Sequence, residues 1–408
     1  MKIDPVRLKK QQEGVAKWFA TGKKGTFRWC TASGKTYLAV LAIKAMMKDN
    51  PLLTTIVAVP TDVLRTQWRD ITASHGLNNI YVQTVHTLVK SKHECDLFIL
   101  DEIHSYTGGP IFSTLFDCVN RSATLGLTAQ ERDNPDDKEV LRKNAPIIDV
   151  LTIADALNNG WISPFRVYNL GVQLTPYDKQ VYQALNDEFN KYFSTFDFNF
   201  DLAMNCLRNK WARENLSKSM NMPIEVIDSH TFQFNRVMRR RKAFLYHSDA
   251  IFDAAVNVIT TFKDKKIITF SESTDMADRI TSKISDSRSF HSNISTQIIN
   301  GKKYGKKRLL PMIMNDFKEG RVRVINSAKS LNEGVDIPDV DMSIKTSYTS
   351  KVLDNIQRLG RTLRKHGNKQ ATEINLYIPG SQSERWLKRS QRSTPGVSWI
   401  ESVDQIDA

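Results

Sequence analysis

Cysteine is scarce in this 408-residue sequence, which contains only Cys30, Cys95, Cys118 and Cys206. The four cysteines are widely separated and form no CxxC pair, which excludes a zinc knuckle and a disulfide framework. Unpaired thiols of this kind are typical of proteins that remain in a reducing compartment. We therefore expect a cytoplasmic protein.

Long hydrophobic runs are also lacking. The first residues, MKIDPVRLKKQQEG, have no apolar signal-peptide core, and no stretch approaches the roughly 18 apolar residues of a membrane-spanning helix. Glycine (18 residues) and proline (13 residues) are too few for a fibrous or low-complexity chain. Hydrophobic residues make up 40% of the sequence, which is enough for packed cores in two or three domains. We expect a soluble protein with no membrane partner.

Acidic residues are outnumbered by basic ones, with 44 Asp and Glu against 58 Lys and Arg and a net charge of +14. This excess favours a polyanionic partner such as nucleic acid. A solubility charge spread over the whole surface explains the excess equally well. The charge alone therefore does not decide the function.

In the first third of the chain, short apolar runs alternate with segments of helical period. Strands are predicted at 26–29, 54–59, 96–100 and 123–127, and helices at 36–47 and 62–74. Buried strands that alternate with helices are typical of a parallel sheet with helices on both faces.

The alternation stops after a strand predicted at 165–174, and a long helical stretch follows from about 177 to 263. It resumes with strands predicted at 266–270, 321–326, 341–345 and 373–377, and helices at 273–285 and 350–364. The α/β pattern therefore predicts two domains, at 1–155 and 266–380. Between them lie a linker strand and helical insertion (156–265) with a hinge near 150–165, and a loosely packed polar tail (381–408) follows.

A phosphate-binding loop is predicted directly after the first strand, in the sequence CTASGKT at residues 30–36. Gly34 lets the backbone approach phosphates, Lys35 places a cation near their oxygens, and Thr36 offers a hydroxyl to Mg²⁺. Trp29 and Ala32 replace glycines of the general pattern, so an ordinary helix start is the alternative. Residues that complete the predicted ATP-binding loop are Thr31, Ala32 and Ser33.

Two adjacent carboxylates, Asp101 and Glu102, follow the buried strand predicted at 96–100. The carboxyl end of a strand in such a sheet is where ligands bind. Asp101 is suited to hold Mg²⁺, and Glu102 to orient and deprotonate a water that attacks the γ-phosphate. A surface Asp-Glu pair is the alternative, but it is rare after a GKT loop.

With these two motifs the sequence resembles the superfamily-two helicases and translocases, whose second motif reads DEAD, DEAH or a close variant, here DEIH. The resemblance implies two RecA-like parallel-sheet domains in tandem, with ATP and Mg²⁺ as cofactors. It also implies that His104 relays hydrolysis to neighbouring motifs. The segment GLTAQE at 126–131 resembles motif III, with Gln130 and Glu131 as departures, and implies that Thr128 links the ATP state to domain movement.

Two further segments of the first domain are similar to motifs that contact the nucleic-acid backbone. They are VPT at 59–61, followed by Leu64, Gln67 and Trp68, and QTVHTL at 83–88. The resemblance implies that DNA is contacted by Pro60, Thr61, Arg65, Thr84 and His86.

Near the N-terminus, residues 8–12 (LKKQQ) resemble the L-R-x-Y-Q element that precedes the phosphate loop. The resemblance implies that Gln12 reads adenine, although Gln11 stands where the element has tyrosine. A polar amphipathic first helix is the alternative.

In the second half, LNEGVDIP at 331–338 is similar to motif V, which implies that Gly334 and Asp336 lie near the nucleotide. QRLGRTLR at 357–364 matches motif VI without a departure. On a helix Gln357, Arg361 and Arg364 share one face, since they fall at i, i+4 and i+7. The resemblance implies that this face reaches the γ-phosphate, with the two arginines as fingers.

The motifs look closest to the repair and recombination branch of the superfamily, including its bacteriophage members. We expect an ATP-dependent DNA helicase or double-strand DNA translocase that acts as a monomer on single-stranded, duplex or branched DNA in repair, recombination or replication. A phage origin would place it in the host cytoplasm or nucleoid. The alternatives are an RNA helicase and a nucleotide-gated nucleic-acid-binding module without turnover.

Two basic clusters, at 236–242 and 302–308, are candidates for additional nucleic-acid contacts, with solvated charge as the alternative. The aromatic residues between 182 and 198 are expected to lie mostly in a core.

Overall fold

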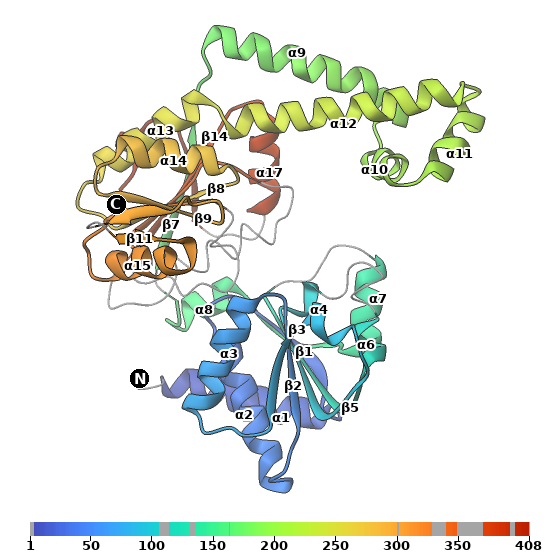
Figure 1. Ribbon diagram of the computed structural model, residues 1–408, viewed down its shortest axis with the longest axis vertical. Helices are drawn as coiled ribbons and strands as arrows, with labels where there is room; N and C mark the ends of the chain where they lie inside the picture. Colours follow the sequence, from blue (N-terminus) through green and yellow to red (C-terminus); the bar gives the residue numbers. More distant parts are fainter. Residues whose placement is uncertain are drawn as a thin grey trace.

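The computed structural model describes residues 4–105, 114–129, 135–162, 164–299, 302–328, 340–348, 370–391 and 396–407. Within these ranges the chain forms two parallel sheets wound with helices, one above the other in Figure 1, and a helical arm projects from the upper one. This confirms the predicted α/β class with two RecA-like domains and a helical insertion.

The first sheet has the strand order β3-β2-β4-β5-β1-β6, and all neighbouring strands are parallel. Its strands are β1 (Lys24–Trp29), β2 (Thr55–Val59), β3 (Ile80–Thr84), β4 (His93–Asp101), β5 (Val119–Thr128) and β6 (Ile147–Leu151). Its helices are α1 (Pro5–Ala20), α2 (Lys35–Asp49), α3 (Asp62–Ser74), α4 (Val85–Leu88), η1 (Ile103–Ser105), α6 (Leu115–Cys118), α7 (Pro135–Asn144) and α8 (Ile153–Asn158).

Helices cover both faces of this sheet, so its inner strands are apolar throughout. On β4, Leu97 and Ile99 pack on one face with Trp18 and Trp68, whereas Phe98 packs on the other. The sequence did not reveal β3 and β6, because both are edge strands with mostly half-buried side chains.

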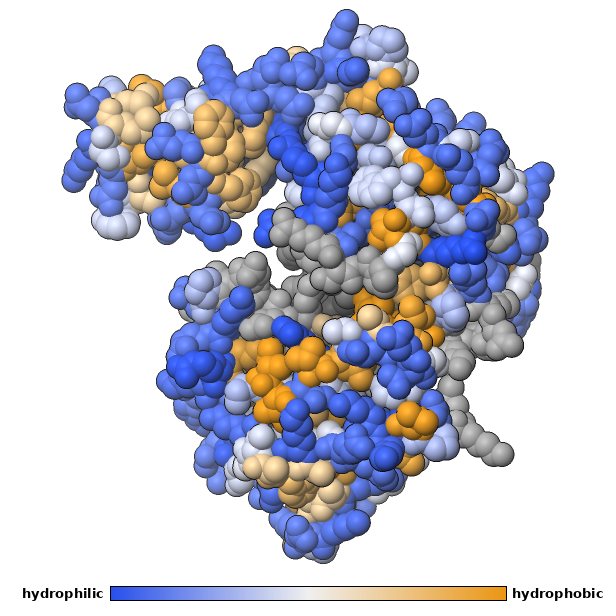
Figure 2. Space-filling model, turned by 180° about the vertical axis from the view of Figure 1, so that it is seen from behind, coloured by the Kyte–Doolittle hydropathy of each residue, from blue (hydrophilic) through white to orange (hydrophobic). Residues whose placement is uncertain are grey.

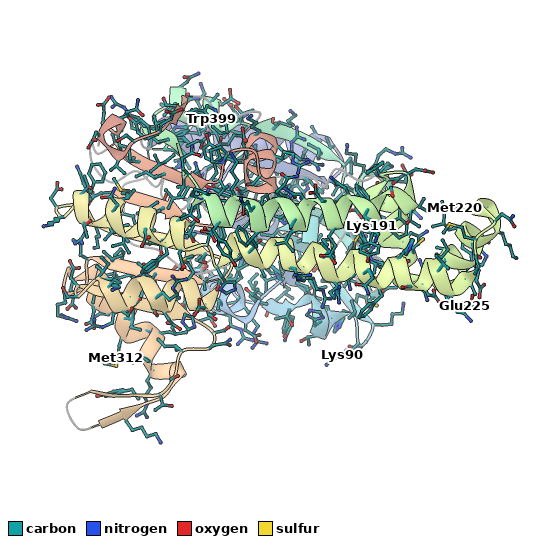
Figure 3. All side chains as sticks on the ribbon, turned by 90° about the horizontal axis from the view of Figure 1, so that it is seen from above. Lys90, Lys191, Met220, Glu225, Met312 and Trp399 are labelled. Carbon is teal, nitrogen blue, oxygen red and sulfur yellow. The ribbon has the colours of Figure 1, made fainter. Side chains whose placement is uncertain are left out.

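The second sheet has the strand order β15-β7-β14-β13-β8-β12-β9, also with parallel neighbours. Its strands are β7 (Phe165–Gly171), β8 (Ile267–Ser271), β9 (Ser287–His291), β12 (Val324–Ala328), β13 (Met342–Lys345), β14 (Ala371–Tyr377) and β15 (Val397–Ile400). The accompanying helices are α13 (Asp249–Thr261), α14 (Thr274–Lys283), α15 (Lys306–Lys318), α17 (Gln382–Ser390) and η3 (Val403–Gln405). A small antiparallel hairpin, β10 (Gln297–Ile299) with β11 (Lys302–Tyr304), projects beside α15 in Figure 3.

The prediction of a loosely packed tail after residue 380 is wrong. Helix α17 follows β14, and β15 pairs with β7 at the edge of the second sheet. Leu387, Ile400, Val403 and Ile406 are buried. The polar composition was misleading because these few apolar side chains are enough to fix an edge strand whose other face is exposed.

The arm consists of α9 (Pro176–Phe193), η2 (Ser194–Phe196), α10 (Phe200–Arg208), α11 (Lys210–Met220) and α12 (Ile224–Tyr246). Helices α9 and α12 run side by side, as Figures 1 and 3 show, around a core that includes Phe189, Phe196 and Phe234. The aromatic residues of the arm are therefore mostly core, as predicted. None of the described helices is both long and apolar enough to cross a membrane.

Some apolar side chains of the arm remain at its surface, as Figure 2 shows from behind. Phe198 is 60% exposed and Trp211 is 70% exposed.

The basic cluster at 236–242 is partly internal, because Arg241 is buried and its guanidinium carbon lies 4.1 Å from the centre of the Phe189 ring. Arg240 is paired with Glu188. Arg240 and Arg241 therefore have contacts within the arm, and this cluster is more than solvated charge.

Candidate active site

The carboxyl ends of the central strands bring most of the predicted site residues of the first domain to one edge of the sheet. Asp101 on β4 lies opposite Leu127 on β5, and Arg28 on β1 lies opposite Thr128. On the other side of β4, Val59 on β2 lies opposite Thr84 on β3. The loops that follow these five strands therefore open at the same edge, where such sheets bind ligands.

The phosphate-binding loop leads directly into α2, whose N-cap is Gly34. Gly34 has a φ of +91°, which strains any L side chain, and a Cβ atom built on it would lie 2.3 Å from Gln11 Nε2 and displace that amide. No side chain caps the first turn of α2. Its backbone N–H groups are thus directed into the loop, as in a phosphate-binding helix start.

Lys35 is folded back onto its own loop. Its Nζ donates to the carbonyl oxygens of Trp29 (2.9 Å) and Cys30 (3.2 Å). The hydroxyl of Ser33 also donates to the Cys30 carbonyl, at 2.7 Å. Thr31, Ala32 and Thr36 are half-buried around this loop. The loop carbonyl oxygens therefore hold the Lys35 ammonium group in a position where phosphate oxygens could replace them.

Asp101 is buried at the end of β4 and is held from two sides. Trp68 Nε1 donates to Asp101 Oδ2 at 2.8 Å, and the Glu102 backbone N–H donates to Oδ1 at 3.1 Å. Burial, and next the charge of the neighbouring Glu102, raise the pKa of Asp101 to about 6. The Trp68 hydrogen bond and the charge of Lys35 oppose this rise. Lys35 and Asp101 thus lie within electrostatic reach of each other.

Glu102 adopts a left-handed backbone conformation, with a φ of +52°. Residues other than glycine, Asn and Asp rarely adopt this backbone conformation, and such strain is concentrated at functional sites. Glu102 Oε2 lies 3.5 Å from His104 Nδ1, and the same Nδ1 lies 3.0 Å from Thr128 Oγ1. The structure therefore joins Glu102, His104 and Thr128 into one chain of contacts between β4 and β5.

On α1 the predicted adenine contact, Gln12, does not face the loop. Gln12 is exposed, whereas Gln11 is only 2% exposed and its Nε2 donates to the Gly34 carbonyl at 3.1 Å. Gln11 Oε1 is buried without a hydrogen-bond partner among the described residues. The signal in the sequence is the spacing of the buried residues on α1, which are Gln11, Gly14, Val15 and Trp18.

Arg7, one turn before Gln11, was missed by the sequence reasoning. Its guanidinium contacts the carbonyl of Ala32 in the loop, and it donates to the carbonyl of Trp161 at 3.1 Å. Arg7 thus connects the loop to the segment that leaves the first sheet.

The predicted nucleic-acid contacts lie at the ends of β2 and β3, which β4 and β5 separate from β1 and the loop that follows it. Thr61 is half-buried and caps α3, where its Oγ1 accepts from the Leu64 N–H at 3.4 Å. Arg65 is paired with Asp62 at 3.0 Å. The Thr84 hydroxyl contacts that of Thr87 at 3.0 Å, and His86 is exposed. Together with the half-buried Pro60, they form one continuous edge of the sheet.

The predicted residues of motifs V and VI lie outside the described residues; these are Gly334, Asp336, Gln357, Arg361 and Arg364. Gln130 and Glu131 of motif III also lie outside them. The segments that contain motifs V and VI follow the carboxyl ends of β12 and β13.

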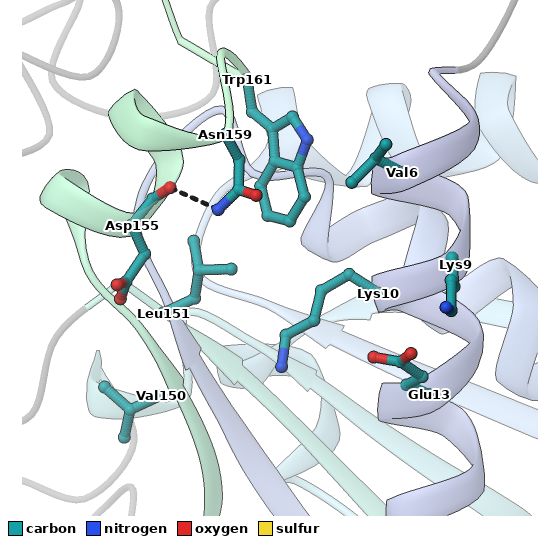
Figure 4. Close-up of a pocket in the computed structure, with 9 residues that line it drawn as sticks. All are labelled: Val6, Lys9, Lys10, Glu13, Val150, Leu151, Asp155, Asn159 and Trp161. Atoms are coloured by element: carbon teal, nitrogen blue, oxygen red, sulfur yellow. Dashed lines mark hydrogen bonds between the residues drawn. The ribbon is translucent and has the colours of Figure 1, made fainter.

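A hollow of about 440 Å³ lies beside the loop, between α1, the end of β6 and α8 (Figure 4). The Trp161 ring lines it together with Lys9, Lys10 and Glu13 of α1. Asn159 Nδ2 donates to the Asp155 carbonyl at 2.7 Å, the contact dashed in Figure 4. None of the predicted site residues that the structure describes lines this hollow, and Asp101 and Glu102 are not part of it.

Comparison with known proteins adds to this geometry. The family model "Helicase conserved C-terminal domain" matches residues 250–366. The DNA 3'-5' translocase XPB2 of Sulfurisphaera tokodaii is 26% identical over an alignment that covers 95% of this chain and 85% of that protein. These matches support the assignment of this chain to the superfamily-two helicases and translocases.

Two solved structures show the fold of this superfamily-two chain. The Hef helicase domain of Pyrococcus furiosus is 16% identical with a TM-score of 0.55, covering 93% of this chain and 97% of that chain. The ATP-dependent Type ISP restriction-modification enzyme LlaBIII, solved bound to DNA, is 14% identical with a TM-score of 0.60. That alignment covers 100% of this chain and 32% of LlaBIII. The helicase family match and the XPB2 relative indicate that the chain is a nucleic-acid-dependent ATPase.

Proposed function

We propose that this superfamily-two ATPase is a DNA helicase or double-strand DNA translocase that acts in repair, recombination or replication. The supporting observation is the shared sheet edge, where Glu102, His104 and Thr128 lie near the loop and Thr61 follows β2, the strand next to β4. DNA is favoured over RNA because XPB2 is named a DNA translocase and LlaBIII was solved bound to DNA.

In this proposal the first domain, residues 1–155, binds ATP. Lys35 neutralises the phosphates, and Glu102 deprotonates the attacking water. Gln11 takes the place of Gln12 as the adenine contact, since its buried Oε1 can accept from an amino group.

The residues fit Mg²⁺ by the chemistry of their donors. Asp101 offers a carboxylate and Thr36 a hydroxyl, and Mg²⁺ prefers oxygen ligands. Asp101 and Thr36 would hold the ion, directly or through water. When bound, Mg²⁺ would neutralise charge on the phosphate oxygens.

The second domain, residues 266–380, is proposed to complete the ATP site with Gly334, Asp336, Gln357, Arg361 and Arg364. Within 156–265, the segment before β7 would connect the two domains, because β7 itself pairs inside the second sheet and the arm projects from that domain. Binding and loss of the γ-phosphate would then close and open the gap between the domains and move a DNA strand.

DNA contacts from Pro60, Thr61, Arg65, Thr84 and His86 would go to phosphates and not to base edges. Such contacts give binding that is independent of sequence and sensitive to salt. The protein would act as a monomer on single-stranded, duplex or branched DNA.

The steady-state ATPase rate tests this proposal. It is measured without nucleic acid and with single-stranded DNA, duplex DNA, a branched junction and single-stranded RNA. We expect stronger stimulation with DNA than with RNA, most of all with duplex or branched DNA, and a loss of about 10²- to 10⁴-fold in Glu102→Gln. Glu94→Gln, at the exposed start of β4, is the matched control and should keep the wild-type rate.

The outcomes separate the alternatives. Stronger stimulation by RNA would make the chain an RNA helicase. A wild-type chain that binds ATP and nucleic acid but releases no phosphate would be a nucleotide-gated binding module.

A further inference from the structure

Trp68 connects two parts of the proposed site that are distant in sequence. It lies on α3 and is 1% exposed, and its indole N–H donates to Asp101 Oδ2 at 2.8 Å. The same helix begins immediately after Thr61, and Arg65 lies just under one turn before Trp68. One helix therefore carries proposed DNA contacts in its first turns and a hydrogen-bond donor to Asp101 in the next.

The packing around Trp68 makes this connection stiff. Its indole is part of the core cluster that contains Val57 and Val59 of β2 and Ile99 of β4. Close-packed side chains of this kind move with their helix and do not turn independently. A displacement of α3 relative to β4 must therefore shift the indole N–H relative to Asp101.

The hydrogen bond to Asp101 is suited to transmit such a shift. Asp101 receives one hydrogen bond from its own loop, through the Glu102 N–H, and one from α3, through Trp68. Hydrogen bonds to a carboxylate are stronger and more directional than those between neutral groups. The orientation of the carboxylate thus depends on the position of α3.

We propose that Trp68 is a positioning residue that transmits DNA binding at the start of α3 to the orientation of the Asp101 carboxylate. Trp68 thereby determines how strongly DNA stimulates ATP hydrolysis. This inference rests on the proposed function, because it requires that the α3 edge binds DNA.

The chain provides a matched control in Trp18. Its indole is also fully buried in the same core cluster, and its Nε1 donates at 2.9 Å to the Thr124 carbonyl, which lies outside the proposed site. Trp68→Phe and Trp18→Phe each remove one buried indole N–H while keeping an aromatic ring. We expect melting temperatures that fall by similar amounts in the two variants.

The two variants should differ in their response to DNA. In Trp68→Phe we expect the stimulation by DNA, which is the ratio of the ATPase rates at saturating DNA and without DNA, to fall about tenfold. The DNA affinity, measured by fluorescence anisotropy, should be unchanged. Trp18→Phe should keep the full stimulation by DNA.

A second measurement uses the wild-type chain without nucleotide or metal. In protein labelled with ¹⁵N-tryptophan, the indole N–H resonance of Trp68 should shift when oligo(dT) is added, and that of Trp18 should not. Whichever of Trp68→Phe and Trp68→Tyr is folded identifies the Trp68 resonance. This readout does not depend on catalysis.

The results distinguish this inference from the proposed function. Full DNA stimulation in Trp68→Phe, or an unmoved Trp68 resonance at saturating oligo(dT), would overturn the role of Trp68 and leave the proposed function intact. If no nucleic acid stimulates the wild-type ATPase, the proposed function fails and this inference fails with it.

Discussion

At the scale of single residues, the site depends on backbone conformations and buried groups that few side chains tolerate. Gly34 and Glu102 both have positive φ angles, at the start of α2 and after β4. Cys30 and Asp101 are buried next to them, so their pKa values are raised. The chemistry of the edge is thus established by local strain and desolvation.

Gly34→Ala should lower both stability and ATP affinity. The left-handed φ alone costs about 1–2 kcal/mol for alanine, and the contact with Gln11 adds to this cost. Gly76→Ala is the matched control, because Gly76 also has a positive φ but has nothing within 4 Å of the added Cβ. Chemical denaturation and ATP titration should rank Gly34→Ala below Gly76→Ala. Equal losses in both variants would contradict a special role of Gly34.

Cys30 should be unreactive at neutral pH. Burial raises the pKa of its thiol to about 11, although Lys35 and Arg7 act in the opposite direction. The thiolate fraction, and with it the rate of iodoacetamide alkylation, should rise about tenfold per pH unit up to that value. Mass spectrometry of the native protein, with Cys30→Ser to assign the product, measures this rate. A plateau below pH 9 would show that the thiolate already exists near neutrality.

At the scale of elements, helix α1 supports the phosphate-binding loop. Gln11 donates to the Gly34 carbonyl, and Arg7 contacts the carbonyls of Ala32 and Trp161. The loop is therefore held from outside by a helix that precedes it in the chain. Helix α3 makes the corresponding contact with the Asp-Glu pair through Trp68.

Gln11→Leu should weaken ATP binding by about 2- to 12-fold, because a hydrogen bond contributes about 0.5–1.5 kcal/mol. Gln12→Leu, on the exposed side of the same helix, should leave ATP binding unchanged. Titration with a fluorescent ATP analogue compares the two variants. A larger effect of Gln12→Leu would support the prediction from the sequence that Gln12 contacts adenine.

At the scale of the whole molecule, the full chain has a net charge of +14. The basic residues of the arm are not all free for solvent or nucleic acid, because Arg241 is buried and Arg236 and Arg240 contact Glu188. The overall charge still favours a polyanion, and the edge with β2 and β3 is the proposed place of contact.

DNA affinity should therefore fall linearly with the logarithm of the salt concentration, and Arg65→Ala should reduce the slope by about one. Arg142→Ala is the matched control. Arg142 forms a similar i,i+3 ion pair with Glu139, but it lies at the end of α7, near the amino end of β6 and away from the proposed edge. Anisotropy titrations at increasing salt provide the slopes. An equal reduction by both substitutions would remove Arg65 from the DNA contacts.

The sequence alone determined the fold class, the inner strands and the order of the motifs. These features are local, since apolar runs, helical period and a strand-loop-helix motif are written in consecutive residues. The same reasoning failed at the edges of the sheets and in the segment after residue 380, where burial depends on a few side chains and on distant partners.

Only the tertiary structure decided which side chains meet. Gln11 and not Gln12 faces the loop, because one residue along a helix turns a side chain by about 100°. Trp68 reaches Asp101 across 33 residues of sequence, and Arg7 reaches Trp161 across 154. Such contacts depend on how α1 and α3 pack on the sheet, which no local pattern specifies.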